Sequence, residues 1–101
     1  MPISGDTYSF TKENVDKAPT YEGVYALYDG NECIYIGRGE GEEGVRTRLQ
    51  AHQRGDEGQC TQSATGYKRE PSDNPKIAEG LLLEEYKEEN GKLPRCNEVM
   101  S

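Results

Sequence analysis

Five side chains in this sequence have the chemistry to act together on a phosphodiester. A guanidinium binds a phosphate through two parallel hydrogen bonds. A single carboxylate together with substrate oxygens is a usual setting for Mg²⁺, and a phenol whose pKa is lowered by nearby cations can serve as a general base. The candidates are Tyr25, Tyr35, Arg48, His52 and Glu79.

The two tyrosines lie in strand-like segments on either side of a turn. Residues 23–28 and 32–36 are rich in β-branched and aromatic residues, and Asp-Gly-Asn at 29–31 favours a turn, so we expect a β-hairpin. A three-residue loop places Tyr25 directly opposite Tyr35 on one face. A two-residue loop shifts the register by one and sends the phenols to opposite faces. An aromatic pair that simply packs is the alternative to a catalytic pair.

The arginine and the histidine lie on a predicted helix. Val45, Leu49 and His52 form one stripe of the segment 45–54, and Arg48 lies beside that stripe. A charged side chain on the core side needs a partner or a function. The alternatives are an arginine whose stem is buried while its head reaches water, and a buried histidine whose hydrogen bonds are satisfied.

The carboxylate lies on a second, longer helix. Asp-Asn-Pro at 73–75 predicts its start and Asn-Gly at 90–91 its end. Glu79 and Glu85 fall inside the apolar sector of this helix, whereas Glu84 lies at its edge. A carboxylate on the inner face is costly unless it binds a cation or hydrogen-bond donors.

The 101 residues suffice for one domain, which we expect to span residues 1–101 in a small α/β (α+β) fold. The other predicted elements are a short helix at 11–17 capped by Thr11, a flexible acidic loop at 38–44, a loop at 56–64, a third strand at 65–69, and a turn or short extended piece at 93–97.

The charge balance limits the partners. Twelve basic residues against nineteen acidic ones give a net charge of −7, which argues against a broad DNA-binding surface and against an anionic membrane. Residues 38–69 are the exception, because this segment contains six basic residues and five acidic ones. A local phosphate-binding face can therefore form in this part of the chain.

The cysteines and the apolar content suggest a location. Cys33, Cys60 and Cys96 include no CxxC pair, and the sequence has one histidine, so we expect reduced thiols rather than a zinc site. No window approaches the roughly 20 apolar residues of a membrane span. Residues 1–6 lack the basic start and apolar stretch of a signal peptide. These features together predict a cytoplasmic protein.

Six sequence elements, in order, resemble those of the GIY-YIG endonucleases. The match spans residues 23–97, with valine in place of the isoleucine of the first triplet. The elements are Gly-Val-Tyr at 23–25, Tyr-Ile-Gly at 35–37, Arg38, Arg-Leu-Gln-Ala-His at 48–52, Glu79 followed by Leu82 and Leu83, and Pro-Arg-Cys-Asn at 94–97.

This resemblance implies a three-stranded antiparallel sheet flanked by helices, and hydrolysis of a nucleic-acid backbone with one metal ion. By position, Tyr25 or Tyr35 activates water, with Tyr25 preferred and the other phenol orienting it. Arg48 stabilises the charge that develops on phosphorus. His52 assists by proton transfer or hydrogen bonding.

The remaining positions bind metal and substrate in this interpretation. Glu79 holds one Mg²⁺ or Mn²⁺, and Arg38 and Asn97 orient the substrate or the site. The loop at 39–44 is longer and more acidic than in the family. The long gap between Glu79 and Asn97 leaves Glu84 as an alternative metal ligand.

The leading hypothesis is a metal-dependent endonuclease that hydrolyses duplex or branched DNA. Because the family usually joins this module to a separate DNA-binding domain, a separate DNA-targeting protein is a further candidate partner. The second hypothesis is a catalytically weak or inactive GIY-YIG module that binds nucleic acid or a protein. The third is an interaction domain with no nucleic-acid role.

Overall fold

The computed structural model describes residue 3 and residues 5–100, so part of the segment 1–6, on which the signal-peptide expectation rests, lies outside the described residues. The elements along the chain are β1 (Tyr8–Ser9), α1 (Lys12–Asp16), β2 (Gly23–Asp29), β3 (Glu32–Gly39), α2 (Gly44–Arg54), the short 3-10 helix η1 (Cys60–Ser63), β4 (Gly66–Pro71), α3 (Pro75–Asn90) and α4 (Arg95–Met100).

The strands form one antiparallel sheet in the order β1-β4-β2-β3. The α+β class is confirmed, but the predicted count of three strands is wrong, because β1 adds a fourth. β1 pairs only Tyr8 with Tyr67 and Ser9 with Gly66. A strand of two residues is too short to show the alternation by which strands are recognised in a sequence.

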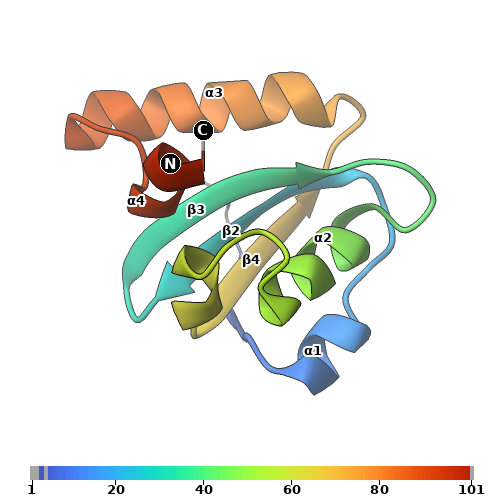
Figure 1. Cartoon of the computed structure of the whole chain (residues 1–101). Coiled ribbons are helices and arrows are strands. Elements are labelled where there is room, and N and C mark those ends of the chain that lie inside the picture. The colour runs from blue at the N-terminus through green and yellow to red at the C-terminus, as the bar shows by residue number, and fades with distance from the viewer. Residues whose placement is uncertain (1–2, 4, 101) are drawn as a thin grey trace.

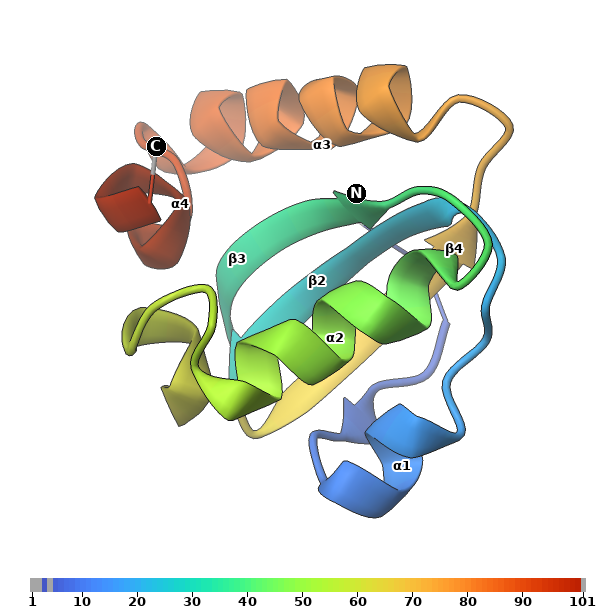
Figure 2. The same cartoon turned by 45° about the vertical axis from the view of Figure 1, so that its right-hand side comes forward.

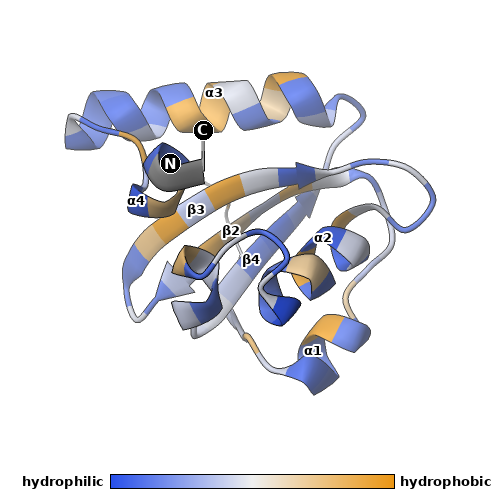
Figure 3. Ribbon diagram, in the orientation of Figure 1, coloured by the Kyte–Doolittle hydropathy of each residue, from blue (hydrophilic) through white to orange (hydrophobic). Residues whose placement is uncertain are grey.

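Helices cover both faces of the sheet. α3 lies across one face, and α1 and α2 lie on the other (Figure 1), as the turned view also shows (Figure 2). Successive side chains of β2 therefore enter different cores. Val24 and Ala26 pack toward α3, whereas Tyr25 and Leu27 pack toward α1 and α2. Apolar residues gather in β2 and β3, while β4 is mostly pale or hydrophilic (Figure 3).

The register of the β2–β3 hairpin differs from both predicted alternatives. Tyr28 pairs with Cys33 next to a two-residue turn, so the three-residue loop is wrong. One step further along, Leu27 pairs with Tyr35. Ile34 is therefore an extra residue in β3, which makes a β-bulge.

The bulge returns both phenols to one face. Tyr25 lies opposite Gly37, and not opposite Tyr35, where the three-residue loop would have placed it. A two-residue turn alone would send the two rings to opposite faces, but the extra residue restores the parity of the strand. The rings of Tyr25 and Tyr35 are diagonal neighbours, with centroids 6.2 Å apart.

The predicted helix signals are confirmed. The Thr11 hydroxyl accepts a hydrogen bond from the Asn14 N–H at 3.1 Å. The Asn74 side chain likewise caps α3 by accepting from the Ile77 N–H. Gly55 ends α2 with a φ of 85°, a left-handed conformation that glycine adopts without strain. No helix in the described part of the chain is long and apolar enough to cross a membrane.

The C-terminal segment departs from expectation. Residues 95–100 form helix α4, where the sequence predicts a turn or an extended piece. Cys96 in α4 forms a disulfide with Cys60 in η1, so the expectation of three reduced thiols is wrong for this pair. Cys33 is a free, buried thiol. Because the paired cysteines are 36 residues apart, no local sequence motif indicates that they pair.

Replacing Gly37 tests the bulged register. A Cβ at Gly37 would lie 2.5 Å from the Tyr25 hydroxyl oxygen and 2.8 Å from a ring carbon of Tyr35. We expect Gly37→Ala to lower the free energy of unfolding by about 1–3 kcal/mol, measured by urea denaturation. In Gly80→Ala, a control in α3, the added Cβ meets no atom within 4 Å. The control should be stabilised by up to about 1 kcal/mol. A Gly37→Ala variant as stable as the parent would contradict this register.

The disulfide gives a second prediction for stability. A cross-link over 36 residues restricts the unfolded chain, so replacing both Cys60 and Cys96 by serine should lower the unfolding free energy by about 4 kcal/mol. A dithiol reductant should destabilise the parent protein and leave the double variant unchanged. Equal responses of the two proteins to the reductant would show that the bond does not form.

Candidate active site

Four of the predicted site residues line one open cleft of about 470 Å³. Tyr35 and Arg38 come from β3, Arg48 from α2 and Glu79 from α3, so the cleft lies over the edge strand between the two helices. Glu40, which follows β3, is the fifth lining residue. The sequence places Glu40 only in an acidic loop, and that acidity is the one signal that could have found it.

Arg38 joins the two carboxylates of the cleft. Its Nη1 donates to Glu79 Oε1 at 2.7 Å, and its Nε donates to Glu40 Oε1 at 2.9 Å. The Glu79 side chain is 19% exposed. Glu84, the alternative metal ligand, is exposed and does not line the cleft.

The guanidinium of Arg48 is also engaged. Its two terminal nitrogens, Nη1 and Nη2, donate to the two carboxylate oxygens of Glu57 at 3.1 Å and 3.0 Å. This two-pronged contact is the geometry in which a guanidinium binds a phosphate. Sequence reasoning missed Glu57, because a contact over nine residues between a helix and its following turn has no periodic signature.

Tyr25 and His52 lie beneath the cleft and do not line it. Both residues are fully buried. The Tyr25 hydroxyl is 2.7 Å from His52 Nε2, and His52 Nδ1 is 2.9 Å from the hydroxyl oxygen of Thr61 in η1. The ring of His52 also lies edge-on to Tyr35, with centroids 4.8 Å apart. No pattern in the sequence points to Thr61, which falls in a segment predicted as a loop.

Burial sets the protonation of these groups. It raises the pKa of both phenols, Tyr25 and Tyr35, and the nearby Arg48 cation opposes this increase in part. Burial, together with Arg48, lowers the pKa of His52 to about 4. At neutral pH the phenols are therefore protonated and the imidazole is neutral, so one ring nitrogen of His52 donates a hydrogen bond and the other accepts one.

Asn97 braces the edge strand and lies outside the lining of the cleft. Its Oδ1 accepts from the Ile36 N–H at 2.9 Å, and its Nδ2 donates to the Ile36 carbonyl at 3.0 Å. The side-chain amide thus takes the place of a neighbouring strand at the residue between Tyr35 and Gly37. Of the two predicted roles, orienting the site fits this contact better than orienting the substrate.

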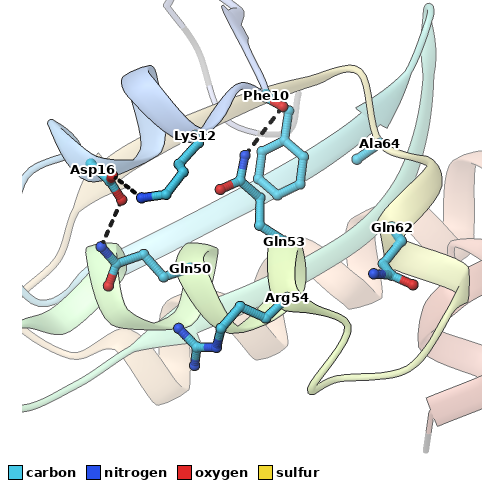
Figure 4. Close-up of a pocket in the computed structure, with 8 residues that line it drawn as sticks. All are labelled: Phe10, Lys12, Asp16, Gln50, Gln53, Arg54, Gln62 and Ala64. Carbon is cyan, nitrogen blue, oxygen red and sulfur yellow. Dashed lines mark hydrogen bonds and ion pairs between the residues drawn. The ribbon is translucent and has the colours of Figure 1, made fainter.

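A second hollow, of about 530 Å³, lies between α1, α2 and η1 and contains none of the predicted site residues (Figure 4). Several of its polar groups bind one another: Lys12 and Gln50 both donate to Asp16, and Gln53 donates to the Phe10 carbonyl. The lining residues are Phe10, Lys12, Asp16, Gln50, Gln53, Arg54, Gln62 and Ala64.

Among the residues that the structure describes, no group of three or more histidine, cysteine or acidic side chains could enclose a metal ion. The carboxylates of the cleft instead suit a cation that takes only one or two protein oxygens and completes its shell with water and substrate. Mg²⁺ is held in this way. Glu79 and Glu40 are the side chains that could supply those oxygens.

In comparisons with known proteins, no protein-family model matches the chain, and no curated protein matches it significantly. The resemblance to the GIY-YIG endonucleases therefore remains a prediction from the residues.

The low pKa of His52 gives a prediction for stability against pH. The unfolded chain binds a proton near pH 6.5, whereas the folded protein binds it only near pH 4. Stability from this group is fully present above pH 6.5 and should fall by about 3 kcal/mol as the pH drops from 6.5 to 4. NMR can follow the imidazole directly, since the sequence has one histidine. A measured pKa at or above 6.5 would contradict the buried, neutral ring.

Proposed function

We propose that this protein is a metal-dependent endonuclease of the GIY-YIG type that hydrolyses phosphodiester bonds of DNA. The observation that carries the proposal is the cleft in which a phenol, two guanidinium groups and two carboxylates meet over the edge strand. Guanidinium groups bind phosphates, and carboxylate oxygens bind divalent cations.

In the proposed reaction, Tyr35 is the phenol that meets the attacking water. It lines the cleft, whereas Tyr25 has no exposed surface. Access therefore favours Tyr35 over Tyr25, the phenol preferred from the sequence. Tyr35 must first give its own proton to solvent before it can take one from water; burial raises its pKa, and the nearby Arg48 cation opposes that increase in part. The phenolate then takes a proton from the attacking water, whose oxygen bonds to phosphorus as the bond to the leaving oxygen breaks, and the leaving oxygen takes up a proton from solvent.

Arg48 and Glu79 supply the electrostatic part of the proposal. Arg48 would bind the phosphate oxygens through its two terminal nitrogens and stabilise the charge that develops on them. Glu79 would hold Mg²⁺ or Mn²⁺ once Arg38 releases it, with Glu40 as a second candidate ligand. Bound in the cleft, such an ion would polarise a phosphoryl oxygen and lower the pKa of coordinated water.

The buried residues would hold the cleft in shape. His52 fixes the Tyr25 hydroxyl, and the ring of Tyr25 fills the space that Gly37 leaves open. Asn97 fixes the backbone of the strand that carries Tyr35. His52 thus has a positioning role in this proposal, and its low pKa disfavours a role as a proton donor at neutral pH.

The second candidate is a binding module of the same fold without catalysis. The ion pairs in and beside the cleft weaken the case for catalysis, because Arg38 is held by Glu79 and Arg48 by Glu57. The net charge of −7 also weakens binding to long DNA. For the nuclease the proposed partners are duplex or branched DNA and a separate DNA-targeting protein, whereas the binding module would bind nucleic acid or a protein. The cytoplasm is the location predicted from the sequence, but the Cys60–Cys96 disulfide argues against it, because such bonds are rare in that compartment.

Cleavage of supercoiled plasmid and of branched DNA in Mg²⁺ or Mn²⁺ tests the proposal. We expect Tyr35→Phe and Glu79→Gln each to slow cleavage by at least about 100-fold, whereas Glu84→Gln, on the same helix, should stay within about twofold of the parent. The rate is measured from the loss of supercoiled plasmid and the appearance of nicked and linear forms.

Three other outcomes would overturn the proposal that the protein is a nuclease. Equal cleavage by all variants would identify a contaminating enzyme. Salt-dependent binding with no cleavage in either metal would select the binding module. A protein that binds neither DNA nor RNA at low salt would be an interaction domain of another kind.

A further inference from the structure

The two terminal nitrogens of Arg48, which would bind a phosphate, are occupied by the carboxylate of Glu57. Glu57 presents its two carboxylate oxygens to Arg48 Nη1 and Nη2 at 3.1 Å and 3.0 Å. Two non-bridging oxygens of a phosphodiester would need the same two donors. A carboxylate and a phosphate cannot both take this position, so the substrate and Glu57 compete for one guanidinium.

Glu57 lies on a turn that lets it reach back to α2. Gly55 and Gly58 on either side of it have φ values of 85° and 102°, and the Gly58 N–H donates to the Gly55 carbonyl at 3.1 Å. The turn thereby places Glu57 beside a helix residue nine positions earlier. The side chains of Arg48 and Glu57 are 38% and 23% exposed, so solvent and a ligand can reach the pair.

The charges around the cleft make this competition matter. Arg38 and Arg48 supply two positive charges, whereas Glu40, Glu57 and Glu79 supply three negative ones. An approaching phosphodiester thus meets a net negative site while Glu57 is in place. Removing the Glu57 charge leaves equal numbers of both signs and frees one guanidinium.

We propose that Glu57 is an intramolecular competitor of the DNA backbone: it holds Arg48 in the free protein and must be displaced before a phosphate binds. This inference rests on the function proposed for the same cleft, and it adds a residue that limits substrate affinity. The opposite role would be a support that orients Arg48 for the reaction. The two roles differ in the direction in which binding changes when the charge is removed.

The test compares Glu57→Gln with Asp56→Asn. Asp56 lies on the same turn and carries the same charge, but it pairs with Arg54 and not with Arg48. Binding of a fluorescent duplex oligonucleotide is measured by anisotropy in EDTA, so that no cleavage occurs. We expect Glu57→Gln to bind about three- to tenfold more tightly than the parent, and Asp56→Asn to stay within about twofold.

Binding by Glu57→Gln that is equal to or weaker than binding by Asp56→Asn overturns the proposal. So does a lack of any binding by Glu57→Gln at low salt. Glu57→Ala serves as the second variant if thermal melting shows that Glu57→Gln is not folded. If the parent also cleaves DNA, we expect Glu57→Gln to have a lower KM, because a competitor of the substrate has been removed. A lower kcat for Glu57→Gln would instead show that Glu57 supports Arg48, and would overturn the proposal.

This design separates the two proposals. A parent protein that binds DNA but cleaves none in any metal fails as a nuclease, and the ratio of affinities still decides the role of Glu57. A parent that cleaves DNA while Glu57→Gln binds no better remains a candidate nuclease without the competitor.

Discussion

The extra residue in β3 is the constraint on which the rest of the site depends. Ile34 turns a two-residue hairpin into one whose two strands present both phenols to the same core. That placement lets Tyr25 cross over Gly37 and reach His52, while Tyr35 stays at the edge of the cleft. Without the bulge, one ring would enter the core beneath α3, and the imidazole would lose its neighbour.

The polar groups of the site separate into an inner and an outer layer. Tyr25, His52 and Thr61 are joined by hydrogen bonds away from water, where an unpartnered polar group would be costly. The outer layer, at the cleft, consists of ion pairs with partial access to solvent, such as Arg38 with Glu79. Breaking a partly exposed ion pair costs little free energy, because solvent screens the charges. A buried, hydrogen-bonded interior thus lies beneath an outer layer of partly exposed ion pairs.

Much of this arrangement follows from local sequence. The caps at Thr11 and Asn74, the hairpin and the two longer helices are encoded by neighbouring residues. The apolar face of α3 includes both Glu79 and Glu85, and only Glu79 lines the cleft, so periodicity alone does not choose between them. The bulge at Ile34 and the pairing of Arg48 with Glu57 were not predictable, because each depends on packing between segments and not on periodicity.

The disulfide links two segments that are distant along the chain and that both support the site. Cys60 precedes Thr61, which contacts the imidazole, and Cys96 precedes Asn97, which holds the edge strand. Residues 60–96 form a covalent ring that also carries Glu79. The bond therefore ties together the chain directly before Thr61 and the chain directly before Asn97, which links the support of the imidazole covalently to the support of the edge strand.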